Sequence, residues 1–148
     1  MDVFVANEQD IGIDETRSGD LARHALGLED VGPEAELSIL YVTRQHIRNL
    51  NKRFAGNDYP TDVLAFPMTE DGAEGDDAYV MGDVVICPEI ADENAKKLGH
   101  DLQSELDTLL VHGTLHLLGY DHQGPDDKAR MEGRLTEVLR TFRSEEDA

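Results

Sequence analysis

Residues 102–122 read LQSELDTLLVHGTLHLLGYDH, and this stretch decides the fold. Its apolar residues fall on nearly every side of a helix: Leu102, Leu106, Leu109, Leu110, Val111, Leu115, Leu117 and Leu118. A helix that is apolar on most of its surface belongs at the centre of a fold, where other elements cover it. Asp101 can cap its N-terminus, and Gly119 breaks the pattern at its C-terminus. We therefore predict a central helix over Leu102–Leu118.

The segments on either side of this helix show alternating strand and helix patterns. Short runs of β-forming residues predict four strands, at Asp2–Ala6, Glu36–Val42, Asp62–Phe66 and Tyr79–Cys87. Amphipathic runs predict further helices at Thr16–Leu28, Arg44–Phe54, Pro88 to Gly99, and about Pro125 to Phe142. Thr69–Asp77 contains glycines and acids with almost no apolar residue, which predicts a mobile surface loop. The order of elements predicts an α+β fold, with a small mixed sheet of about four strands covered by helices.

Length and composition narrow the class of protein. A chain of 148 residues, 39% of them hydrophobic, fits a single soluble domain spanning residues 1–148. No run approaches the roughly 18 apolar residues that cross a bilayer, so we expect no membrane association. The N-terminal residues lack the features of a signal peptide, and Cys87 is the only cysteine. Both observations predict a cytoplasmic protein.

Charge is unevenly distributed along the chain. The net charge of −19 argues against general binding of polyanions. Residues 37–57, however, contain no acid, and four cations lie there: Arg44, Arg48, Lys52 and Arg53. The first three are spaced i, i+4, i+8, so they share one face of the predicted helix. A basic face of this kind can contact phosphates, although it can also be simply solvated.

Three of the six histidines lie within eleven residues, at His112, His116 and His122. On a helix, His112 and His116 point the same way one turn apart, a spacing that lets two imidazoles share one metal ion. Gly119 ends the helix, so that the chain can reverse and His122 can supply a third ligand. Three protein ligands leave a fourth position for water, as in catalytic zinc sites. A hydrogen-bonded core histidine is the plainer interpretation, but it does not explain this spacing. We therefore predict one bound Zn²⁺.

Two neighbours of these histidines admit more than one role. Gly113 occupies the position at which zinc proteases of the HExxH type carry their glutamate base, so that base is missing. The glycine itself costs about 1 kcal/mol in a helix interior and serves either close packing or the metal site. Asp121 either orients a ligand histidine or caps the turn.

At these residues the sequence resembles the YbeY family of bacterial endoribonucleases, whose signature H-G-x-L-H-L-x-G-Y-D-H is matched throughout His112–His122. The resemblance extends to Asp58–Pro67 and to Gly82–Cys87. It implies a zinc site at the three histidines and cleavage of single-stranded RNA. With RNA as the implied substrate, Arg44, Arg48, Lys52 and Arg53 are the candidates for RNA contact. It also implies a role in rRNA processing, notably 16S rRNA 3′ end maturation during ribosome biogenesis, with ribosomal small-subunit proteins as partners.

Two positions depart from the family pattern. An arginine of many members that is thought to contact RNA is replaced by Ala55, and the usual serine of the strand motif is Ala65. Arg53 lies close to Ala55 in sequence but does not occupy the matching position. Metal binding does not depend on either change, whereas substrate contacts do.

The resulting hypothesis is a zinc-dependent, single-strand-specific endoribonuclease. Either a water bound to the metal or the ribose 2′-hydroxyl attacks phosphorus, and a 2′,3′-cyclic phosphate on the product would exclude water attack as the sole step. One alternative is a zinc metallopeptidase or amidohydrolase, which the missing glutamate disfavours. The other is a non-catalytic ribosome-assembly factor that zinc only stabilises.

Overall fold

The computed structural model describes residues 1–68, 79–121 and 123–147. Its elements, in chain order, are β1 (Asp2–Asn7), α1 (Glu15–Leu28), β2 (Ala35–Tyr41), α2 (Arg44–Ala55), β3 (Val63–Pro67), β4 (Tyr79–Ile86), α3 (Pro88–Leu98), α4 (Leu102–Leu117) and α5 (Pro125–Glu146). Every strand and helix expected from the sequence is present. The predicted loop Thr69–Asp77 lies outside the described residues.

The four strands form one mixed sheet in the order β1-β2-β4-β3. β1, β2 and β4 are parallel, whereas β3 pairs antiparallel with β4 and forms one edge of the sheet. The α+β fold with a four-stranded mixed sheet is therefore confirmed. None of the helices in the described residues is long and apolar enough to span a bilayer.

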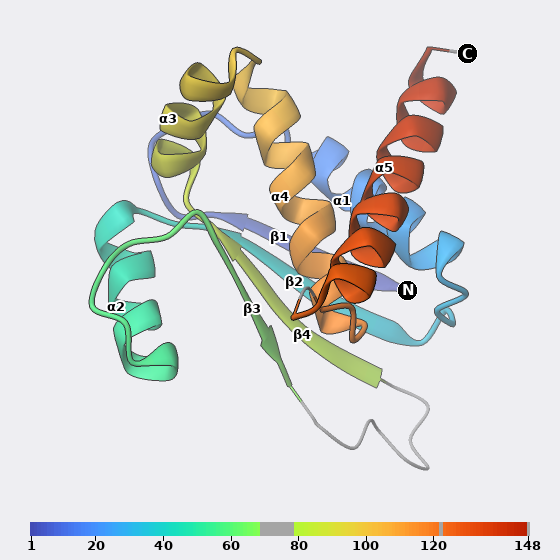
Figure 1. The fold of residues 1–148 in the computed structure, drawn as a ribbon, viewed down its shortest axis with the longest axis horizontal. Coiled ribbons are helices and arrows are strands. Elements are labelled where there is room, and N and C mark those ends of the chain that lie inside the picture. The colour runs from blue at the N-terminus through green and yellow to red at the C-terminus, as the bar shows by residue number, and fades with distance from the viewer. Residues whose placement is uncertain (69–78, 122, 148) are drawn as a thin grey trace.

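Helices cover the two faces of the sheet unequally (Figure 1). α1, α4 and α5 lie on one face, and α2 lies on the other. Side chains alternate along β2 accordingly: Leu37, Ile39 and Tyr41 enter the large core beneath α1 and α4. Val42, just after the strand, joins a smaller cluster beneath α2 together with Ile47, Val85 and Cys87. We call these the α4 face and the α2 face.

A β-bulge in β4 decides which residues reach each face. Glu36 pairs with Val80 but Leu37 pairs with Gly82, so Met81 is the extra residue. Gly82 has φ +137°, and a Cβ there would lie 2.1 Å from the Phe66 carbonyl oxygen, so only glycine fits. Beyond the bulge, Val84 faces α4, and Val85 faces α2.

α4 is the central helix, as predicted. The Asp101 carboxylate caps it by accepting a hydrogen bond from the Ser104 amide at 2.7 Å. At the other end Gly119 has φ +98°. The Gly119 amide bonds to the His116 carbonyl and the Tyr120 amide to the Leu115 carbonyl, which is the Schellman pattern. The chain therefore leaves α4 directly after the two helical histidines.

Gly113 allows α4 to lie close to the sheet. A Cβ at this position would lie 2.7 Å from Val84 Cγ1 and 3.4 Å from Val63 Cγ2. Both valines belong to the strands beneath, and Val84 is fully buried. Of the two roles left open for this glycine, close packing is the one that the contacts support.

A buried ion network joins α1, α4 and α5. Arg17 donates to both carboxylate oxygens of Asp107, at 3.1 and 2.6 Å, and also to Glu146. Arg143 lies 3.8 Å from the same Asp107 carboxylate. The Asp107 side chain is only 4% exposed, so this pair holds three helices together from within.

The last helix continues to Glu146, so the predicted end at Phe142 is wrong. Residues 143–146 carry no apolar periodicity that would predict a helix. Arg143 and Glu146 instead pair with Asp107 and Arg17, and these long-range contacts stabilise the final turn.

Candidate functional site

The two helical histidines lie one turn apart near the C-terminus of α4. His112 is half-buried and lines a cavity of about 240 Å³ with four residues of α5, namely Lys128, Met131, Glu132 and Leu135. His116 is exposed, at the last turn before the Schellman reversal. An ion held between these imidazoles would therefore face solvent at the end of α4.

The third predicted ligand, His122, lies outside the described residues. Within residues 1–68, 79–121 and 123–147, no three His, Cys, Asp or Glu side chains are close enough to hold a metal ion. The two imidazoles at i, i+4 are nitrogen donors of the kind that zinc takes, so this part of the donor set fits the ion. The half-buried Asp121 follows Tyr120 and engages in an interaction, so it is not a free carboxylate.

The basic helix α2 lies on the opposite face of the sheet from α4. Arg44 is paired with Glu93 at 2.7 Å and with Glu89 at 3.3 Å, both on α3. The hydrogen bond from Arg44 lowers the pKa of Glu93. The structure thus separates the predicted cations from the predicted metal ligands.

One acid of the following turn, Asp58, pairs with two more of these cations. Arg48 Nε lies 2.9 Å from Asp58, and Lys52 Nζ lies 3.9 Å from the same carboxylate. The hydrogen bond from Arg48 lowers the pKa of Asp58. Three of the four predicted RNA-contact residues therefore already have acidic partners.

Arg53 differs from the other three. Its guanidinium lies over the Phe54 ring, 5.2 Å from the centroid. Among the described residues no carboxylate lies within ion-pair distance of it. Arg53 is thus the cation of α2 whose charge is most available to a ligand.

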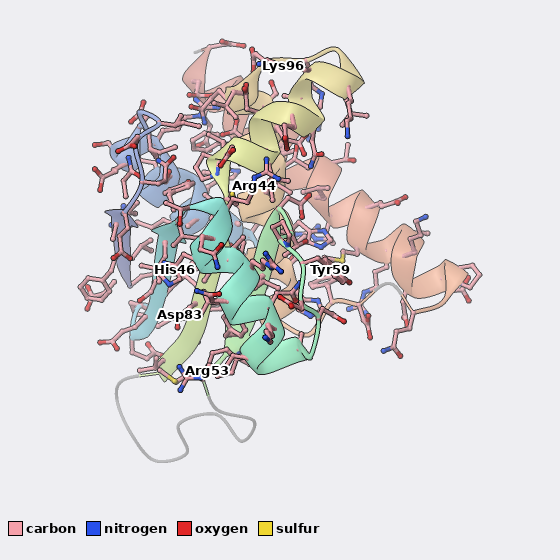
Figure 2. All side chains as sticks on the ribbon, turned by 90° about the vertical axis from the view of Figure 1, so that its left-hand side faces the viewer. Arg44, His46, Arg53, Tyr59, Asp83 and Lys96 are labelled. Atoms are coloured by element: carbon pink, nitrogen blue, oxygen red, sulfur yellow. The ribbon has the colours of Figure 1, made fainter. Side chains whose placement is uncertain are left out.

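The α2 face also contains a cavity of about 620 Å³ between α2 and the ends of β3 and β4. It is lined by Leu40, His46, Leu50, Arg53, Phe54, Phe66, Pro67, Met68, Asp83 and Val85. In Figure 2, His46, Asp83 and Arg53 lie along one side of α2, and Tyr59 lies on the other. Sequence reasoning did not find this cavity, because its walls come from β2, α2, β3 and β4.

Comparison with known families identifies the chain. The family model described as "Endoribonuclease YbeY" matches residues 4–143. The chain belongs to the YbeY family.

Individual YbeY relatives match over almost their full length. The endoribonuclease YbeY of Thermobifida fusca is 44% identical over 147 residues, covering 97% of this chain and 95% of that protein. That of Salinispora tropica is 41% identical over 153 residues, covering 97% and 98%. Among solved structures, TM1509 from Thermotoga maritima has a TM-score of 0.63 at 26% identity, covering 97% of this chain and 93% of that one.

Membership of the YbeY family agrees with the resemblance inferred from residues 112–122. The two candidate regions lie on opposite faces of the sheet, and both adjoin the edge strand β3. α4 contacts it through Gly113 beside Val63, and the cavity contacts it through Phe66 and Pro67.

Proposed function

We propose that this protein is a zinc-dependent endoribonuclease that cuts single-stranded rRNA during maturation of the small ribosomal subunit. One zinc ion would be held by His112, His116 and His122. The observation that carries the proposal is the pair of imidazoles one turn apart at the end of α4, followed at once by a reversal of the chain. Membership of an endoribonuclease family supplies the reaction class.

His112, His116 and His122 would hold the zinc ion, which would supply Lewis-acid chemistry at a phosphate oxygen of the RNA. The residues of the chain hold the ion and position its ligands. α4 fixes the orientation of His112 and His116 because its other sides, which carry Leu106, Leu110 and Leu115, are buried in the core. Asp121 is the candidate for orienting a ligand histidine. Gly113 presents no side chain, so no base of the protease type stands next to His112, and this disfavours a peptidase.

Metal content and RNA cleavage should be lost together when a ligand is removed. We expect purified wild-type protein to contain about one zinc ion per chain. His116→Ala should be metal-poor and inactive but folded, because the His116 side chain is exposed. The matched control is His100→Gln, outside the motif, which keeps a donor for the Glu105 carboxylate that His100 contacts at 2.7 Å.

Elemental analysis, cleavage of a single-stranded RNA and circular dichroism of the same preparations test this. Native protein without zinc, or His112→Ala and His116→Ala variants that still cleave, would contradict the proposal. Unfolding of His116→Ala or of chelator-treated protein would instead favour a zinc-stabilised assembly factor without catalysis. Analysis of the new RNA ends for a 2′,3′-cyclic phosphate identifies the nucleophile.

The proposal of an rRNA substrate and of ribosomal partners is supported by the family resemblance and by the charge of the protein. A net charge of −19 disfavours general RNA binding, so delivery by small-subunit proteins would help the enzyme reach its substrate in the cytoplasm. Cells that lack the protein should accumulate small-subunit rRNA with unprocessed 3′ ends. Complementation with wild type but not with His116→Ala would assign this defect to cleavage.

A further inference from the structure

The cavity of the α2 face lies on the opposite face of the sheet from His112 and His116, and it exposes large apolar side chains. Phe54 is 60% exposed and Met68 is 59% exposed, both on its rim. The Phe54 ring contacts Phe66, with ring centroids 5.3 Å apart and planes tilted by 60°, and the Arg53 guanidinium lies over it. Phe54 nevertheless stays 60% exposed, so part of its surface is open to another flat ring. Exposed aromatic side chains around a hollow are typical of a binding site.

Two charged groups of opposite sign also line the cavity. Asp83 lies opposite Phe66 in the β3–β4 register, on the α2 face. No partner for its carboxylate is found among the described residues. Arg53 lies near the C-terminal end of α2 and, among the described residues, has no acidic partner. The cavity therefore offers a carboxylate that only accepts hydrogen bonds and a guanidinium that only donates them.

We propose that this cavity binds an unpaired nucleobase of the RNA substrate. Phe54 stacks on the base, Asp83 accepts hydrogen bonds from its Watson–Crick edge, and Arg53 contacts a neighbouring phosphate. Guanine is the best-matched base, because it presents two adjacent N–H donors to the two carboxylate oxygens. Uracil presents one donor between two carbonyl oxygens, which the carboxylate repels. The inference rests on the proposed function, since it assumes that RNA is the substrate.

The position of the cavity suits a strand that also reaches the histidines. β3 is an edge strand, with Phe66 and Pro67 at the cavity on one face and Val63 beneath Gly113 of α4 on the other. β3 forms the edge of the sheet between α2 and α4 (Figure 1), so a single strand that contacts both regions would pass around this edge and not across the sheet. A duplex is too wide and stiff to make this turn and keeps its bases stacked, so the arrangement selects single-stranded RNA.

Phe54→Ala tests the stacking, with Phe4→Ala as the matched control. Phe4 is 59% exposed, but it lies on β1 at the far edge of the sheet. We expect Phe54→Ala to weaken binding of a short single-stranded RNA about tenfold, measured by fluorescence anisotropy. Phe4→Ala should bind like wild type. Both side chains are mostly exposed, so both variants should fold.

Asp83→Asn tests the reading of the base. Wild type should prefer an oligonucleotide with one guanine in a uracil background over the all-uracil strand by about tenfold. Asp83→Asn should lose this preference, because an amide both donates and accepts. Asp20→Asn on α1 removes an equal charge elsewhere and should keep the preference.

Three outcomes separate the two proposals. Loss of stacking and of base preference in these variants, with RNA cleavage retained in the controls, supports the base pocket. If wild type cleaves RNA but Phe54→Ala binds like Phe4→Ala and Asp83→Asn keeps the preference, the pocket proposal is overturned, and the cavity is open to a protein partner. If wild type neither binds nor cleaves RNA, the proposed function itself fails.

Discussion

The two faces of the sheet are built from the same strands but serve different purposes. On the α4 face, helices bury Leu37, Ile39 and Tyr41 completely or nearly so, and the Asp107 ion pair is enclosed between them. On the α2 face, α2 together with Ile90 of α3 covers a smaller cluster and leaves a cavity with Phe54 exposed beside it. The difference indicates that the α4 face supplies most of the stability and fixes the helix that carries His112 and His116, whereas the α2 face leaves a cavity open to a ligand.

Removing the buried carboxylate of the α4 face should have the largest effect on stability. Asp107→Ala leaves the Arg17 guanidinium, only 19% exposed, without its bidentate partner. Breaking such a buried pair costs about 3–5 kcal/mol. Urea unfolding followed by circular dichroism measures the loss.

Asp58→Ala is the matched control on the α2 face, since its carboxylate also pairs with an arginine, Arg48, but is half exposed. Solvent screens that pair, so the variant should unfold close to wild type. Equal losses in the two variants would show that the two faces contribute alike.

Adding one methyl group to α4 should have a smaller effect. Gly113→Ala brings a Cβ to 2.7 Å from Val84 Cγ1, and such overpacking costs about 1–3 kcal/mol, partly offset by about 1 kcal/mol of helix propensity. Gly27→Ala in α1 has no atom within 4 Å of the new Cβ and should instead stabilise the protein. Both are measured by urea unfolding. A stabilised Gly113→Ala would mean that α4 is not seated tightly on the sheet.

Local pattern predicted the elements well, because their signals lie within each segment. The leucines of residues 102–118 and the alternation in Glu36–Val42 need no distant contact to be recognised. The end of α5 could not be predicted, because Arg143 and Glu146 are held by Asp107 and Arg17, far away in sequence.

The same contrast between local patterns and long-range contacts explains which parts of the two candidate sites could be predicted from the sequence. The spacing of His112 and His116 is local and was recognised, and it predicts a zinc site that includes His122. The four cations of α2 were also recognised, but the pairing of three of them with Glu93 and Asp58 depends on the tertiary fold. The alternation of side chains in Asp62–Phe66 and Tyr79–Cys87 could have indicated which residues of each strand share the face that carries the cavity. Placing Phe66 beside Asp83, however, requires the register and the bulge at Gly82.

The prediction with the smallest expected effect concerns whether α2 detaches from the sheet without global unfolding. Cys87 is fully buried beneath α2 with Ile47, and burial raises the pKa of its thiol. A thiol reagent can therefore react only after an opening. Because α2 is anchored by few buried side chains, we expect labelling through local detachment, with a weaker denaturant dependence than global unfolding.

Two matched variants locate that opening. Ile47→Val beneath α2 and Ile39→Val on the α4 face each remove one methylene from a fully buried site, at a cost of about 1 kcal/mol. If α2 detaches locally, Ile47→Val accelerates Cys87 labelling about fivefold, while Ile39→Val lowers global stability and leaves the labelling rate unchanged. Equal acceleration by both variants would mean that Cys87 is exposed only when the whole sheet unfolds, because only then does packing on the far face matter to it.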